Sequence, residues 1–305
     1  MSRSSSSAIP PRPPGFRSRL LAACSWALPS RFRSDIPVVP VVRLSGAIGV
    51  STPLRPGLML STVAKTLDRA FAVRKARAVA LVINSPGGSP TQSHLIFKRI
   101  RQLADEKNIP VFAFIEDVGA SGGYMLACAA DEIICDRFSI VGSIGVVGGS
   151  FGFPKLLEKL GIERRLYTSG DSKVMLDPFL PEKPEDVKRI KALQKDIHDD
   201  FIDLVKGRRG TRLRGPDKTL FSGEFWNAPR AIELGLADHL GELRATLRER
   251  FGDKVRTPLI QGERSLFGRK VPGVQLLAAM TGRAPLADDL ISALETRALW
   301  SRYGL

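Results

Sequence analysis

Two continuous apolar runs, each leading into a turn of small residues, most strongly limit what this chain can fold into. The first is Ala78-Val-Ala-Leu-Val-Ile83, which stops at Asn84-Ser-Pro-Gly-Gly88. The second is Val111-Phe-Ala-Phe-Ile115, from which a short loop leads to Ser121. Runs that are apolar at every position are typical of strands buried on both faces of a parallel sheet. The chain is therefore expected to contain such a sheet covered by helices.

Helical spacing of apolar residues separates the expected strands. Helices are predicted over Leu60–Phe71, over a segment with Leu95, Ile96, Ile100 and Leu103 on one face, from Ser121 to about Ala130, over Phe153–Leu160, over Glu185–Lys206 and over Ala228–Leu234. Short strands are predicted over Glu132–Cys135 and Ser139–Val141, with an edge strand in Pro37–Leu44 because its prolines exclude a central position. Strands alternating with helices indicate an α/β fold of βαβ type.

The chain divides into three parts by composition. Residues 1–35 are rich in serine, proline and arginine and are expected to be a disordered basic leader. Residues 36–250 form the main domain. Residues 251–305 are expected to be a helical extension, with helix-forming segments at Val274–Met280 and Ala287–Trp300.

Charge and cysteine content exclude several classes of protein. The formal net charge is +15, but residues 1–34 hold six arginines and no acid, and the rest is spread without a long basic run. Nucleic acid is therefore not an expected partner. Three cysteines without a C-x-x-C pair indicate neither a disulfide scaffold nor structural zinc.

The leader has two readings. It has the composition of an organelle transit peptide, or it is a flexible tail that contacts anionic lipid through Leu20–Leu28 and the flanking arginines. We favour the second reading and keep the first open. No stretch reaches the roughly 18 to 20 apolar residues of a membrane span. The expected location is therefore cytoplasmic or peripheral to a bacterial membrane.

The sharpest local pattern is Gly119-Ala-Ser-Gly-Gly-Tyr124, between a buried strand and a helix. A nucleophilic serine on a strand-to-helix turn needs small neighbours, and the start of the helix supplies backbone N–H groups beside it. The alternative is a glycine-rich turn in which Ser121 only caps the helix. This pattern alone leaves both readings open.

A nucleophilic serine also needs a base. The chain has three histidines, His94, His198 and His239. A hydrolase triad would have to use His239, with Asp199 or Asp203 as its acid. Such a triad remains open, but it fits the expected architecture poorly.

A site without histidine would use a lysine whose pKa is lowered by burial. Lys173 is followed by three apolar residues, although an isolated lysine is usually a surface charge. Two loops add context. Consecutive glycines after Pro86 offer N–H groups for an oxyanion hole, and Ser143 follows a short strand where its hydroxyl could orient an amine.

The sequence motifs of this chain occur in an order that resembles the signal peptide peptidase A family, including its SohB-like members. They read Ser-Pro-Gly-Gly, Ala-Ser-Gly-Gly-Tyr, Ala-Asp-Glu-Ile, Gly-Ser-Ile-Gly-Val, Gly-x-x-Lys and, last, Ala231-Ile-Glu-Leu-Gly-Leu-Ala-Asp238. The resemblance covers about residues 37–250. It implies a Clp protease/crotonase-like fold of repeated ββα units.

The same resemblance implies a Ser/Lys dyad and a serine endopeptidase that needs no metal or cofactor. Ser121 would be the nucleophile, Lys173 the general base and Ser143 a hydrogen-bond partner of the lysine amine. The oxyanion hole would be formed by Gly87, Gly88 and Gly122. Because the neutral amine is the working form of the base, activity is expected to rise with pH into the alkaline range.

The chain is expected to carry one catalytic repeat, without the N-terminal membrane anchor of many relatives. In the long form of the family, two repeats divide the dyad between them. A single-repeat chain is therefore expected to form a ring-like homo-oligomer in which Lys173 serves the Ser121 of a neighbour. Expected substrates are peptides, with signal peptide remnants or membrane-associated polypeptides among them. The alternatives are a crotonase-type acyl-CoA hydratase or hydrolase and a catalytically idle membrane-associated scaffold.

Overall fold

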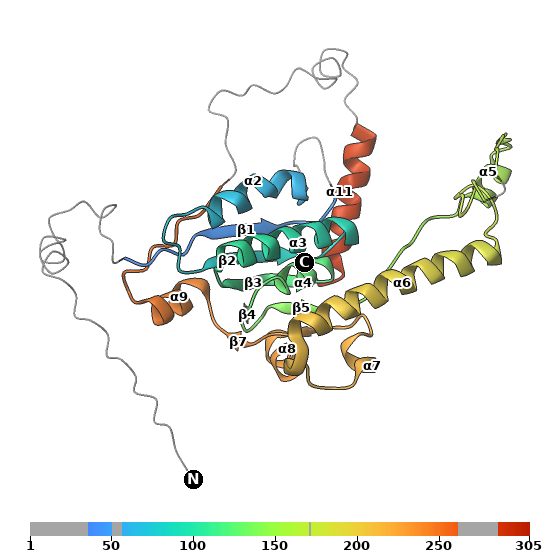
Figure 1. The fold of residues 1–305 in the computed structure, drawn as a ribbon. Helices are drawn as coiled ribbons and strands as arrows, with labels where there is room; N and C mark the ends of the chain where they lie inside the picture. Colours follow the sequence, from blue (N-terminus) through green and yellow to red (C-terminus); the bar gives the residue numbers. More distant parts are fainter. Residues whose placement is uncertain (1–35, 51–56, 171, 262–285) are drawn as a thin grey trace, which may run out of the picture.

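The computed structural model describes residues 36–50, 57–170, 172–261 and 286–305. Its centre is a seven-stranded sheet in the order β1-β2-β3-β4-β7, with β5 pairing β3 and β6 (Figure 1). All strand pairs are parallel except β5–β6. The strands are β1 Val41–Ser45, β2 Val79–Ser85, β3 Val111–Ala120, β4 Glu132–Cys135, β5 Ile140–Gly142, β6 Phe225–Asn227 and β7 His239–Leu240. The predicted α/β fold with a parallel sheet is confirmed.

Strand β3 changes partner along its length. Its first half pairs with β4 through Phe112–Ile115, and its last residues, Val118–Ala120, pair with β5. On its other side it pairs with β2, and Gly119 lies opposite Ser85. The carboxyl ends of β2 and β3 therefore lie side by side, which is where parallel sheets bind their ligands.

Most helices cover one face of the sheet and share a single apolar core with it. They are α2 Leu60–Phe71, α3 Pro90–Lys107, α4 Gly122–Ala127 and α8 Ala228–Glu233, with α6 and the short α7 Asp217–Leu220 contributing at one end. Helix α3 buries Ile96, Ile100 and Leu103 as predicted, whereas Leu95 is 39% exposed and lies off that face. No helix within the described ranges is long and apolar enough to cross a membrane.

The opposite face of the sheet is covered in two places. Helix α9, Leu243–Phe251, packs Leu247 against Phe112 and Phe114. The predicted helix Ala287–Trp300 is present as α11, Leu286–Ser301, and Tyr303 after it packs on the end of β3.

The chain after α9 continues beside the sheet. The N–H of Val39 donates to Arg256 and the N–H of Ile260 donates to Val41, both at 2.8 Å. This segment flanks β1, which ends the main strand order, so the globular body reaches at least Ile260. The leader and the predicted helix Val274–Met280 lie outside the described residues.

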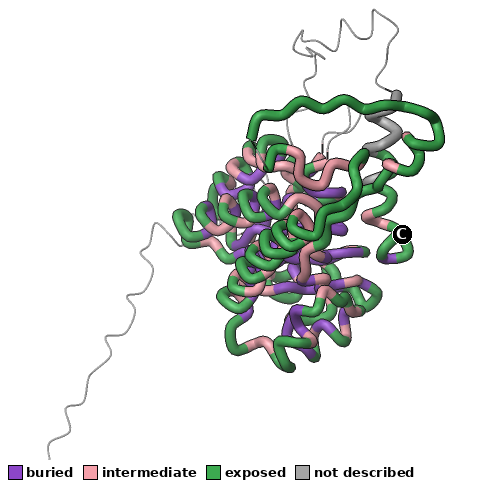
Figure 2. Tube along the Cα trace, turned by 90° about the vertical axis from the view of Figure 1, so that its right-hand side faces the viewer, coloured by how far each residue is buried: buried purple, intermediate pink, exposed green. Residues whose placement is uncertain are grey.

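Helix α6, Pro184–Arg209, projects from the body and carries at its outer end a segment that contains α5, Pro154–Lys159 (Figure 1). We call residues 147–183 the arm. None of the described arm residues is buried, and Figure 2 shows this stretch as exposed. In α6 only Phe201, Val205 and Arg209 are buried. The predicted apolar face of this helix is thus uncovered over its outer half, where Leu193 is 52% exposed.

Candidate active site

Ser121 lies in a strained turn between β3 and α4. Its φ of +53° falls in the left-handed region, which costs a residue other than glycine roughly 1–3 kcal/mol. The side chain makes no capping hydrogen bond to α4. The structure therefore contradicts the reading in which Ser121 merely caps the helix. Such strain at a half-buried serine is typical of a nucleophile on a strand-to-helix turn.

The small residues around Ser121 are required by close packing. A Cβ at Gly122 would lie 2.3 Å from Ser93 Oγ, and one at Gly123 would lie 2.4 Å from the Ser85 carbonyl oxygen. The Ser121 N–H donates to the Gly142 carbonyl at 2.8 Å. The turn is thus pinned to the ends of both β2 and β5.

Two of the three glycines predicted for the oxyanion hole border Ser121. A Cβ at Gly87 would lie 2.8 Å from both the Gly122 nitrogen and the Ser121 Cβ. The Gly122 N–H is at the first position of α4, where a donor has no intrahelical acceptor. The Gly87 N–H donates to Ser85 Oγ at 3.2 Å. A Cβ at Gly88 would lie 2.1 Å from the Ile48 carbonyl oxygen, and the role predicted for Gly88 stays a prediction.

A pocket of about 550 Å³ opens beside Ser121. Its lining includes Ser121, Ser143, His198, Phe225, Arg302 and Tyr303. Ser143 also has a left-handed φ of +53°, and its N–H donates to the Glu224 carbonyl at 2.6 Å. The structure thus places both predicted hydroxyls in one pocket.

The sequence motifs did not reveal the aromatic wall of this pocket. Tyr303 is 9% exposed, stacks edge-on with Phe225 at 5.1 Å between ring centroids, and donates its hydroxyl to the Pro86 carbonyl at 3.4 Å. Residues after 262 lie outside every motif, so no local signal marked Tyr303. The wall places aromatic surface beside the candidate nucleophile.

The histidines are arranged differently from a triad. His198 lines the pocket, and its Nε2 lies 3.0 Å from the Ile144 carbonyl, to which it donates. His239, the base of the alternative triad, lies on β7, and its Nε2 is 3.5 Å from the Glu132 carboxylate. His239 does not line the Ser121 pocket. The triad with His239 is therefore not assembled in this structure.

Lys173 lies in the arm and not in the Ser121 pocket. It is exposed, and its side chain makes no polar contact within the described part of the chain. The arm is held together by its own contacts, which include the Phe153–Phe179 ring pair at 5.7 Å and the Arg164–Asp177 ion pair. A single chain therefore keeps the two predicted dyad side chains in separate regions. Among the described residues, no group of histidine, cysteine and carboxylate side chains could hold a metal ion.

The model of peptidase family S49 matches residues 104–252, which include Ser121, Ser143 and Lys173. The match and the protease-named relatives support an SppA/SohB-like member of peptidase family S49. The α/β fold with its parallel sheet agrees with this membership, and so does the predicted resemblance to signal peptide peptidase A and SohB.

Several curated proteins are similar to this S49 chain. A Synechocystis protein named as a protease is 29% identical over 82% of this chain and 88% of its own length. The chloroplast serine protease SPPA of Arabidopsis thaliana is 30% identical over 67% of this chain and 31% of its own length. A Brucella abortus protein named Na(+)/H(+) antiporter NhaA is 54% identical over 96% of this chain. The chain spans only 39% of that protein, whose name describes the whole.

Proposed function

We propose that this S49 chain is a serine endopeptidase with Ser121 as nucleophile and Lys173 of a neighbouring copy as general base. The observation that carries the proposal is the strained Ser121, which is uncapped and faces a pocket beside free helical N–H groups. Relatives named as proteases and as a serine protease support the same reaction class.

The proposed reaction forms and breaks an ester at Ser121. The Oγ attacks the peptide carbonyl carbon as its proton passes to the lysine amine. Backbone N–H groups at Gly122, and at Gly87 once it turns from Ser85, would stabilise the oxyanion. The C–N bond then breaks and the leaving amine takes the proton from lysine. Water attacks the acyl ester by the reverse sequence, which releases the acid and restores Ser121.

The position of the arm supports a base supplied in trans. Lys173 is outside the pocket of its own chain, and the arm presents apolar side chains to solvent, among them Phe151, Leu160 and Tyr167. Exposed apolar surface of this kind marks a protein interface. A ring in which each arm reaches the next body would cover this surface and complete each site.

The proposed substrates are extended peptides with an apolar side chain near the cleaved bond. The Phe225–Tyr303 wall, with Val146 and Val147, gives the pocket its affinity for such side chains. Signal peptide remnants and membrane-associated polypeptides are substrates of this kind.

Mixing two inactive variants tests the proposal. Ser121→Ala and Lys173→Ala subunits should each be inactive, whereas oligomers assembled from both should regain activity at interfaces with an intact serine and an intact lysine. Co-assembly is verified with two affinity tags. Mixed oligomers without activity would place the dyad within one chain.

The same proteins distinguish the rival functions. Labelling of Ser121 by a fluorophosphonate, absent in Ser121→Ala, excludes an idle scaffold. Turnover of acyl-CoA in place of peptides would favour the crotonase-type enzyme. We expect labelling and peptide hydrolysis without acyl-CoA turnover.

A further inference from the structure

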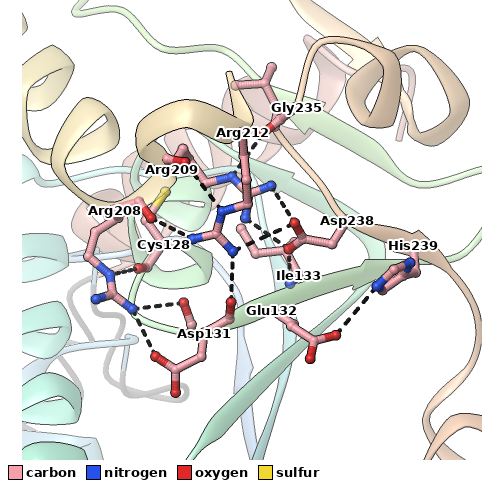
Figure 3. Close-up of polar contacts among 12 residues, drawn as sticks. Cys128, Asp131, Glu132, Ile133, Arg208, Arg209, Arg212, Gly235, Asp238 and His239 are labelled. Atoms are coloured by element: carbon pink, nitrogen blue, oxygen red, sulfur yellow. Dashed lines mark hydrogen bonds and ion pairs between the residues drawn. The ribbon is translucent and has the colours of Figure 1, made fainter. Parts of the chain in front are cut away.

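Arginine side chains bind the backbone at the end of α4 opposite Ser121. Four consecutive carbonyl groups, from Cys128 to Asp131, each accept a hydrogen bond from a guanidinium. Figure 3 shows Arg208 and Arg212 beside Cys128 and Asp131. The bonds are Arg208 Nε to Cys128 at 2.8 Å, Arg101 Nη1 to Ala129 at 3.0 Å, Arg208 Nη2 to Ala130 at 3.0 Å and Arg212 Nη1 to Asp131 at 2.9 Å. Carbonyls at a helix end lack intrahelical donors, so these arginines satisfy them.

Arg208 makes the largest share of these bonds and comes from α6. Its Nη2 also lies 3.1 Å from the Asp131 carboxylate. One planar guanidinium thus joins two carbonyls and one carboxylate around the end of α4. A lysine ammonium cannot reproduce this planar set of donors.

The base of α6 has a second, independent anchor. Arg209, whose side chain is 1% exposed, binds both carboxylate oxygens of Asp238 at 2.8 Å. Burial raises the pKa of Asp238, but the hydrogen bonds from Arg209 and the Ile133 N–H outweigh it, so the pKa is held below its ordinary value. Loss of Arg208 therefore leaves α6 attached to the body.

At its other end, α4 packs closely against its surroundings. The helix has six residues, all buried, and is about 9 Å long. A Cβ added at Gly122 or Gly123 would lie closer to neighbouring atoms than real Cβ atoms do, so the amino end of α4 is tightly packed. A displacement at the arginine end is therefore transmitted to Ser121 and the Gly122 N–H.

We propose that Arg208 is a positioning residue for Ser121. By holding the carboxyl end of α4, it aligns the Ser121 hydroxyl and the Gly122 N–H at the amino end. The proposal rests on the proposed peptidase function. It assigns a role in the reaction to a side chain of the helix that carries the arm.

The test measures peptide hydrolysis by Arg208→Ala and Arg208→Lys. We expect kcat to fall at least about tenfold with KM little changed, because small misplacements of reacting groups cost rate and not binding. Millimolar guanidinium should restore part of the rate of Arg208→Ala. The matched control is Lys206→Ala, since Lys206 lies on the same helix but pairs with Asp217 and Phe221, and it makes no polar contact with α4 among the described residues. It should keep the parental rate.

Two results would overturn the inference. One is a folded Arg208→Lys protein with the parental kcat. The other is a lowered kcat in Arg208→Ala that guanidinium does not restore, combined with a parental kcat in Arg208→Lys. If Arg208→Ala fails to fold, Arg208→Lys alone decides. A parent protein that neither hydrolyses peptides nor labels at Ser121 defeats the peptidase proposal itself, whereas an active parent with equally active Arg208 variants defeats only this inference.

Discussion

The body and the arm are built on opposite principles. In the body, Ser121 is held by contacts from within the chain, and the glycines around it leave no spare volume. In the arm, no described residue is buried, and large apolar side chains face solvent. The difference agrees with the proposal that the nucleophile half of the site is complete in one chain and that the lysine half is supplied at a second surface.

Helix α6 belongs to both regions. Its inner end is fixed by Phe201, Val205 and the Arg209–Asp238 pair, and its outer end has no comparable packing. The packing of the body and that of the arm can therefore be compared at the two ends of one helix.

The largest effect is expected at the nucleophile. Ser121→Ala should lower peptide hydrolysis by at least about a thousandfold, because the residual rate would rest on the oxyanion hole and binding alone. Its thermal unfolding should change little, since the hydroxyl caps no helix. Hydrolysis and circular dichroism measure the two quantities. Activity in a folded Ser121→Ala protein would remove the distinction between the two halves of the site.

Breaking the buried ion pair should cost the body about 3–5 kcal/mol of unfolding free energy in Asp238→Asn, because Arg209 is left without its counter-charge. The matched control is Glu233→Gln, whose surface pair with Arg230 is worth about 0–1 kcal/mol.

The difference in unfolding free energy between the parent protein and Asp238→Asn should become smaller as the pH falls. The pKa of Asp238 is lowered in the folded protein, so its contribution is full above the ordinary carboxyl range and is lost as the pH falls through the folded-state pKa. Urea unfolding of parent and variant at several pH values measures it. A stability difference that increased on acidification would contradict the lowered pKa of Asp238.

The two ends of α6 should respond unequally to truncation. Phe201→Ala, in the core, should cost about 3–5 kcal/mol. Leu193→Ala, half-exposed on the outer half, should change the stability of the isolated chain by no more than about 0.5 kcal/mol. Chemical denaturation of the monomer provides both numbers. An equal cost at the two positions would mean that the outer half is already packed within one chain.

Local patterns were sufficient for the sheet and the nucleophile turn. The apolar runs predicted β2 and β3 because strands buried on both faces leave an unbroken signal, and helical spacing predicted α2 with both its ends. The Ser121 turn could be recognised because its glycines stand together in the sequence, although the contacts that require them come from the distant Ser85 and Ser93.

Long-range contacts explain what the sequence could not predict. Helix α4 ends at Ala127 and not near Ala130, and the carbonyls of Cys128 and Ala130 after it accept hydrogen bonds from Arg208 of another helix. Tyr303 and His198 reach the pocket only through tertiary packing. The apolar face predicted for α6 is real as a pattern, but amphipathicity alone does not say whether the covering surface comes from the same chain.

An arm that carries the lysine outward makes the proposed catalysis depend on protein concentration. A newly made chain would hold a correctly positioned serine and no base, and would be inactive in the same way as a precursor enzyme. Specific activity would climb as subunits accumulate and fall again on dilution, without any cleavage or modification of the chain. Encounter between copies, set by how many the cell holds in one place, would be the step that switches the peptidase on.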